Sequence, residues 1–215
     1  MPLRWALRCA LALALLWPAC APAQAQTVLS LVSPDGRIGC IQGMTGIGRP
    51  PAWENVAERE APGGWALAET AGDATDLRFP ICILPGGILR DLEATLRLKM
   101  VSGTQQAGGL VVRAQDAANY YVIRASAIDR TVKLYRVQKG RRAQIASKDA
   151  PVKPGEWHTL AVRLVADTFD ISFDGAPLFS VTDRSLPQPG AIGVWSQADS
   201  VTHFGALTLK DPSPR

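Results

Sequence analysis

The sequence has little histidine and cysteine, and it has no long hydrophobic run after its first residues. The chain has 215 residues but only two histidines, His158 and His203, and four scattered cysteines. That is too few for a zinc site built from the usual Cys and His ligands. A calcium loop of alternating Asp and Asn is also missing, so we expect neither a metal nor another cofactor. Because no stretch of about 20 apolar residues occurs, we expect no transmembrane helix.

Strong charge of either sign is absent as well. The 23 Lys and Arg residues nearly balance the 19 Asp and Glu residues, and the formal net charge is +4. One short cationic run, Lys139-Gly140-Arg141-Arg142, lies where a hairpin turn is expected and has no interleaved aromatic residues. A solvated turn is the simpler interpretation of this run. Nucleic acid is therefore not an expected partner.

The N-terminus has the features of an export signal. Arg4 and Arg8 precede the short apolar core Ala10–Trp17, and Ala23-Gln24-Ala25 then supplies the small residues of a cleavage site. The apolar core is too short to span a bilayer. We therefore expect residues 1–25 to be a signal peptide.

Cleavage there would make Gln26 the first residue of an exported protein, either periplasmic or extracellular. An alternative is lipidation at Cys20, which follows a small residue as lipoprotein processing requires. Cys40 and Cys82 remain in either case. Because exported proteins fold in an oxidising compartment, we expect these two cysteines to form a disulfide.

Short segments typical of β-strands fill most of the chain. They are rich in β-branched and aromatic residues, and Gly, Pro, Asp or Asn separates one from the next. In Asp91–Met100, apolar and polar side chains alternate, which is the pattern of a strand with one buried face. Asp174-Gly175 predicts a tight hairpin turn. The pattern predicts an all-β protein with two antiparallel sheets packed as a sandwich.

We expect a single folded domain. Residues 26–62 contain the turn-forming stretches 33–36 and 48–51, and they predict an irregular segment packed on the sandwich. Residues 63–210 are expected to form the β-sandwich itself. Residues 211–215 are expected to be a flexible tail, because their prolines cannot pair in a sheet.

Side-chain alternation also indicates a candidate ligand-binding face. Its members are Arg113, Tyr120, Arg124, Tyr135 and Trp195, which alternate along their strands with apolar residues assigned to the core. Aromatic rings stack on the apolar faces of sugars, and arginines donate hydrogen bonds to hydroxyls, so this face suits a carbohydrate. A structural alternative stays open, because Arg and Tyr on neighbouring strands often form pairs that cover a sheet. A shift of one residue in any strand would invert the assignment.

Several segments resemble the concanavalin A-like jelly-roll superfamily. The resemblance covers roughly Ala52 to Lys210 and is nearest to exported bacterial domains of the 3-keto-disaccharide hydrolase-like and laminin-G-like kinds. It implies a jelly-roll sandwich that binds or cleaves glycans on a concave sheet. The segments that carry it are 108–113, 119–124, 134–137, 155–158, 173–175, 190–195 and 198–204.

The sequence departs from the catalytic members of that superfamily. The last strand reads Phe204-Gly205-Ala206 where relatives carry an acidic or amide residue, and the Glu-x-Asp-x-x-Glu strand of the glucanases is missing. Glycoside hydrolysis needs two carboxyl groups across one bond. We therefore interpret the chain as an exported, non-catalytic module that binds carbohydrate or another envelope ligand. The alternatives are a glycosidase with Asp199 or Asp116 as its acid, and a structural component that binds a protein partner through a sheet edge.

Overall fold

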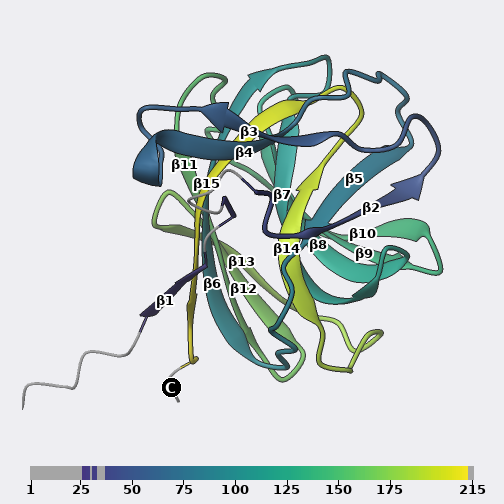
Figure 1. Cartoon of the computed structure of the whole chain (residues 1–215). Helices are drawn as coiled ribbons and strands as arrows, with labels where there is room; N and C mark the ends of the chain where they lie inside the picture. The colour runs from purple at the N-terminus through teal and green to yellow at the C-terminus, as the bar shows by residue number, and fades with distance from the viewer. Residues whose placement is uncertain (1–25, 30, 33–36, 213–215) are drawn as a thin grey trace, which may run out of the picture.

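The computed structural model describes residues 26–29, 31–32 and 37–212 (Figure 1). The predicted signal peptide, Cys20 and residues 213–215 of the predicted tail lie outside this part of the chain. Two antiparallel sheets pack face to face, as the sequence predicts, and η1 (Pro62–Gly64) is a single short 3-10 turn. No helix within these ranges is long and apolar enough to cross a membrane.

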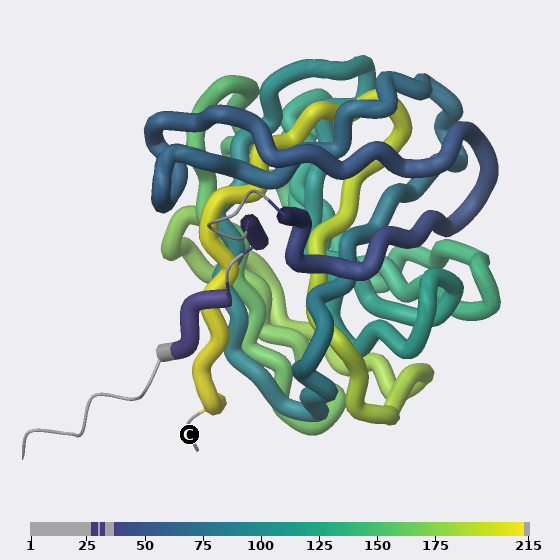
Figure 2. Tube along the Cα trace, in the orientation of Figure 1, coloured from purple at the N-terminus to yellow at the C-terminus, as the bar shows by residue number. Residues whose placement is uncertain are grey.

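The first sheet, sheet A, has eight strands. They are β1 (Gln26–Leu29), β3 (Trp53–Ala57), β4 (Trp65–Glu69), β6 (Leu92–Ser102), β11 (His158–Val165), β12 (Thr168–Phe173), β13 (Ala176–Thr182) and β15 (Val201–Lys210). Their order across the sheet is β13-β12-β11-β6-β15-β4-β3, and β1 pairs with the last residues of β15. Figure 2 shows β15, in yellow, running beside β1 and β6 near the C-terminus.

The second sheet, sheet B, has seven strands. They are β2 (Ile41–Gly46), β5 (Arg78–Ile83), β7 (Ala107–Asp116), β8 (Asn119–Ser126), β9 (Thr131–Gln138), β10 (Arg141–Asp149) and β14 (Ala191–Ser196). Their order is β10-β9-β8-β7-β14-β5-β2. Strands β7 to β10 follow one another as a meander, so this half of the sheet is built from contacts close in sequence.

Tight turns join the strands where the sequence predicts them. At Lys139-Gly140 the two φ angles are 52° and 74°, and at Asp174-Gly175 they are 48° and 79°. Positive φ at both central residues is the type I′ conformation, whose twist matches that of the flanking strands. Glycine at the second position adopts this conformation without strain.

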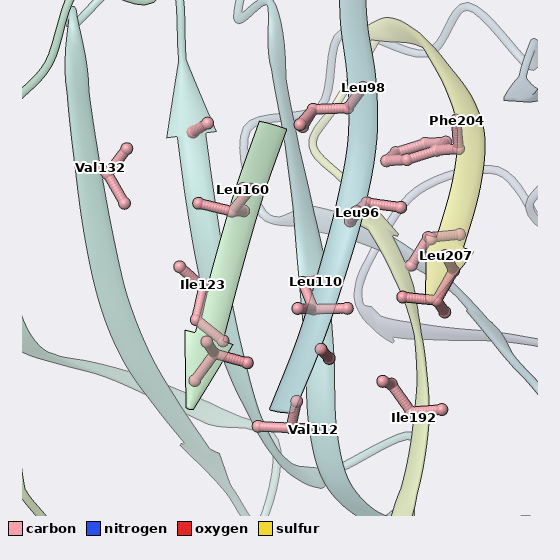
Figure 3. Close-up of a cluster of buried hydrophobic side chains, with 14 of the residues drawn as sticks. Leu96, Leu98, Leu110, Val112, Ile123, Val132, Leu160, Ile192, Phe204 and Leu207 are labelled. Atoms are coloured by element: carbon pink, nitrogen blue, oxygen red, sulfur yellow. The ribbon is translucent and has the colours of Figure 1, made fainter. Parts of the chain in front are cut away.

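The main core lies between the two sheets (Figure 3). In β6 every second side chain from Leu92 to Met100 is buried, which confirms the alternation predicted for Asp91–Met100. Leu96 and Leu98 face Leu110 and Ile123 from sheet B, and Phe204 and Leu207 of β15 extend the same layer. The alternation therefore places the hydrophobic core correctly for these strands.

The N-terminal segment is more regular than its sequence indicates. Residues 26–62 were expected to be irregular, yet they contribute β1, β2 and β3, which pair with β15, β5 and β4 respectively. These strands are short and two of their partners are distant in sequence, so local patterning does not show them. The predicted disulfide between Cys40 and Cys82 is confirmed, with the two Cα atoms 5.4 Å apart. It joins the chain just before β2 to β5.

Candidate ligand-binding face

Sheet B is strongly curled, with its concave side facing away from sheet A. Arg142 lies in β10 at one edge, and Phe79 lies in β5, five strand spacings away. In a flat sheet five spacings would measure roughly 24 Å. The guanidinium carbon of Arg142 nevertheless lies 4.3 Å from the centre of the Phe79 ring. The turn after β7 also reaches the far edge, because the Thr45 hydroxyl of β2 donates to the Ala117 carbonyl at 2.5 Å.

The concave side holds a second hydrophobic cluster, separate from the main core. Phe79 and Trp195 stack with ring centroids 5.7 Å apart and an interplanar angle of 15°. The guanidinium of Arg142 also lies over Tyr135, at 4.7 Å, and over Trp195, at 5.9 Å. We call Phe79, Tyr120, Tyr135 and Trp195, with Arg142 over three of them, the aromatic layer. It combines planar rings with a planar cation, which attract one another electrostatically.

Four of the five predicted site residues lie on this concave side. Tyr120 and Trp195 have no exposed surface, Arg124 is 3% exposed, and Tyr135 is partly exposed. The hydroxyls of Tyr120 and Thr45 lie 2.9 Å apart, and burial raises the pKa of Tyr120 to about 12. The strand alternation therefore identifies the shared face, but the curl of the sheet covers most of it. A ligand approaching this conformation meets Tyr135 and Arg142 before the buried rings.

The fifth predicted residue, Arg113, lies elsewhere, and this corrects the sequence interpretation. Arg113 has a φ of 51° at a β-bulge of β7, so the alternation shifts and Ala114 takes the concave side instead. The Arg113 guanidinium donates to the carbonyls of Arg90, Ala166 and Leu186 and to the Asp167 carboxylate. These contacts use all five of its N–H donors, and they join three loops at the end of the sandwich.

A glycine holds that bulge in place. A Cβ atom at Gly190 would lie only 2.4 Å from the carbonyl carbon of Arg113. No side chain fits there, so the close approach of the β13–β14 connection to β7 requires glycine. The glycine at 190 is the one sequence feature that marks this contact.

Arg142 was missed as a candidate because the sequence places it in a cationic turn. Lys139, Gly140 and Arg141 are exposed, as a solvated turn predicts, but Arg142 is partly buried. It pairs with Val137 across β9 and β10, so it shares the concave side with that buried valine. Burial lowers the pKa of Arg142. Only the curl of the whole sheet brings it over rings from β5, β9 and β14, and no local pattern contains that information.

Polar side chains lie at one end of the aromatic layer. Arg124 of β8 donates to the Gln197 side chain at 3.1 Å and to the Asp129 carboxylate at 2.7 Å. Strand β7 lies between β8 and β14, and its Gly109 is in register with both Arg124 and Trp195. The missing side chain at Gly109 leaves room for Arg124 to extend across β7. At this end of the face the guanidinium and amide groups are buried, and the Asp129 carboxylate is the more exposed partner.

A cavity of about 380 Å³ opens at the other end of the concave side. It is mostly apolar, with the exposed side chains of Ile41 and Ile88 at its rim and Gln42, Gln115 and Asp116 as its polar groups. Its floor includes Ile81 and Ala114 from the second cluster, so it continues the surface of the aromatic layer. Its lining residues are Ile41, Gln42, Gly43, Ile81, Ile83 and residues 84–88, 114–117 and 189–191.

The two acidic residues considered for catalysis do not lie together. Asp116 ends β7, and its carboxylate accepts hydrogen bonds from the Ala118 amide and the Asn119 side chain. Asp199 accepts hydrogen bonds from the backbone and hydroxyl of Thr104, beside the start of β7. A ten-residue strand separates them, about 30 Å. They cannot act as a pair on one glycosidic bond.

The outer side of sheet A carries a separate charged cluster. Glu58 contacts Lys99 at 2.5 Å and the Nδ1 atom of His203 at 2.7 Å. The hydrogen bond from Lys99, with a further one from His203, lowers the pKa of Glu58 to about 2. The Trp157 ring packs nearby against Gly205, where a Cβ would lie 3.1 Å from the ring. Glycine at this position of β15 therefore makes room for Trp157.

No protein-family model matches this sequence, and no curated protein sequence matches it either. Solved structures do match the fold. The Bacillus subtilis carbohydrate-binding module CBM66 matches with a TM-score of 0.63 and 19% identity, over 79% of this chain and 96% of that one. A Bacillus subtilis protein of unknown function with a galectin-like fold matches with a TM-score of 0.57 and 11% identity, over 81% and 90%.

A third match is the Bacteroides ovatus xyloglucan PUL protein GH43B, with a TM-score of 0.55 and 17% identity. The match covers 90% of this chain but 41% of that one, so it concerns one part of a larger protein. At such identities the likeness concerns the fold. The chain has a lectin-like β-sandwich fold, similar to those of carbohydrate-binding and galectin-like domains.

Proposed function

We propose that this chain is a carbohydrate-binding module, and that the sugar binds on the concave side of sheet B. The observation that carries the proposal is the aromatic layer, where rings from three strands meet under Arg142 beside an open cavity. Sugar rings present flat apolar faces ringed by hydroxyls, so they match aromatic surfaces bordered by planar polar side chains. Similarity to a carbohydrate-binding module supports the same function.

The predicted site residues on this face differ in their exposure to solvent. Tyr135 is the predicted residue that retains exposed surface, and it lies under Arg142. We propose that Tyr135 and Arg142 contact the sugar directly, and that Arg124 and Gln197, which are almost fully buried, hold the polar end of the face in place. Tyr120 and Trp195 would support the floor from beneath. Arg113 is not part of this surface.

A binding screen with matched variants tests the proposal. Purified protein is screened on a glycan array, and hits are measured by isothermal titration calorimetry. Replacing Tyr135 with alanine should weaken binding by about 1–3 kcal/mol, because a stacking ring is lost. Trp65→Ala is the matched control, because Trp65 is a half-exposed aromatic residue on sheet A. Equal effects of the two variants, or no glycan bound by the unaltered protein, would contradict the proposal.

We also propose that the module is exported and non-catalytic, with residues 63–210 as its main domain. Export is supported by the Cys40–Cys82 disulfide, since such bonds persist in oxidising compartments. Asp116 and Asp199, the two candidate acids, lie about one strand length apart and do not form a catalytic pair with each other. Mass spectrometry of the secreted protein tests cleavage before Gln26, and mass spectrometry of glycans after incubation tests turnover.

A further inference from the structure

The guanidinium of Arg142 lacks a counter-charge. Its Nη1 atom is buried, and no hydrogen-bond acceptor for it exists in the described part of the chain. Arg113, by contrast, has acceptors for all its donors. Buried donors are nearly always satisfied in folded proteins, so a persistent exception calls for an explanation. Arg142 is held instead by the ring faces of Phe79, Tyr135 and Trp195.

The charges around Arg142 are mainly positive. Burial chiefly lowers the pKa of Arg142, and the nearby Arg124 cation lowers it further. The carboxylate of Asp129 lies on the same side of the sheet, but it already pairs with Arg124 and Lys133. Among residues 37–212, no ion pair joins Arg142 to an acidic group.

The adjoining hairpin adds further positive charge. Lys139 and Arg141 are exposed at and next to its turn, a few residues from Arg142. Asp116 is the acidic residue on the neighbouring turn, and its carboxylate is engaged by Ala118 and Asn119. The rim of the aromatic layer therefore attracts anions.

We infer that the ligand of the concave side is an acidic glycan, and that Arg142 pairs with the carboxylate of one of its uronic acid residues. The inference rests on the carbohydrate-binding function proposed above. A carboxylate accepts two parallel hydrogen bonds from a guanidinium, which would satisfy Nη1. To form this pair, the Arg142 side chain moves off the Tyr135 ring and toward the ligand. This movement uncovers the ring for stacking against the sugar. Charge recognition and stacking then occur on one uronic acid unit.

A pair of ligands that differ only in charge tests the inference on the unaltered protein. The probes are an oligogalacturonate and its methyl ester, which has the same sugar rings without the negative charge. We expect the acid to bind about tenfold more tightly or better, with an advantage that shrinks as salt is added. Equal affinity, or tighter binding of the ester, overturns the inference while leaving carbohydrate binding in place. If neither probe nor any glycan on the array binds, the proposed function itself fails.

A sulfated galactan forms a third arm of the test. Binding of this polymer without binding of the oligogalacturonate would overturn the carboxylate assignment, since the recognised anion would be a sulfate.

Two arginine variants then localise the effect. Arg142→Gln should lose about tenfold in affinity for the acid relative to the ester, so that the preference for the acid disappears. Arg141→Gln is the matched control, one position away and exposed, and it should change either affinity by less than about threefold. Equal losses in both variants would show a diffuse charge effect and overturn the role of Arg142. Thermal unfolding verifies that each variant folds, and the ligand pair decides the inference if Arg142→Gln does not.

Discussion

Arg78 and Glu69 form a bidentate ion pair that links the two sheets inside the protein. The Nη2–Oε1 distance is 2.7 Å and the Nη1–Oε2 distance is 3.0 Å. Their side chains are 0% and 1% exposed. Arg78 also donates to the carbonyls of Arg49, Pro50 and Ala198, so every one of its N–H groups is used.

Breaking this pair should destabilise the fold severely. Glu69→Gln removes the bidentate counter-charge of the buried Arg78 guanidinium and leaves only the Asp73 carboxylate, 4.0 Å from its Nε atom. We expect the free energy of unfolding to fall by about 3–5 kcal/mol. Urea titration measures this. Glu156→Gln is the control, because the Lys153–Glu156 pair is more than half exposed, and it should cost less than about 1 kcal/mol. Similar losses for the two variants would show that the buried pair is not a major link between the sheets.

Trp195 should behave as a core residue. Trp195→Ala removes a fully buried ring that stacks on Phe79, and the expected loss is about 3–5 kcal/mol. Chemical denaturation of this variant and of Trp65→Ala, whose ring is half exposed, provides the comparison. A Trp195→Ala protein as stable as Trp65→Ala would mean that the concave side is open in solution.

The Cys40–Cys82 disulfide should contribute substantially to stability. It closes a loop of 42 residues, which in the chain-entropy model corresponds to about 3–4 kcal/mol. Denaturation of the double variant Cys40→Ser/Cys82→Ser measures the loss. Intact mass before and after reduction should differ by about two hydrogens. Free thiol that titrates in the native protein would contradict the bond.

Glu58 should make the protein sensitive to strong acid. Its pKa falls from an ordinary value of 4.5 to about 2 in the folded state, chiefly because of Lys99. A carboxyl with a lowered folded-state pKa stabilises the protein above its unfolded-state pKa, and that contribution disappears as the pH falls toward the folded-state pKa. Urea titrations near pH 7 and near pH 3 should therefore show a smaller pH-dependent loss for Glu58→Gln than for the unaltered protein. An equal loss in both would rule out Glu58 as a source of this acid sensitivity.

Alternation of side chains predicts the faces of regular strands well, and its failures have definable causes. It places Tyr120, Arg124, Tyr135 and Trp195 on one side of sheet B because their strands have no bulge before those residues. The assignment of Arg113 is wrong because a single residue with positive φ inverts the alternation of the rest of its strand. No periodicity contains that information.

Other features depend on contacts between distant parts of the chain. Arg142 of β10 can lie over the Phe79 ring of β5 only if the two edges of sheet B approach each other. That approach results from the twist and curl accumulated over the whole sheet, and not from any one segment. Strand β1 exists because β15, at the opposite end of the sequence, offers it an edge. The sequence predicts the sandwich and most of the residues of the concave side. It does not predict the curl of sheet B that places Arg142 over those rings.

The position of β15 has a consequence for how the chain reaches its native state. This strand comes last, yet it lies inside sheet A, paired with β6 on one side and with β4 and β1 on the other. Until β15 has been synthesised, the paired strands of sheet A form two separate parts, because β15 is the strand that connects them. One part is β3–β4 and the other is β6–β11–β12–β13. Sheet A can therefore assemble only after translation has passed Lys210, although the β7–β10 meander can form earlier. Until then the apolar side of the meander has no complete sheet to pack against.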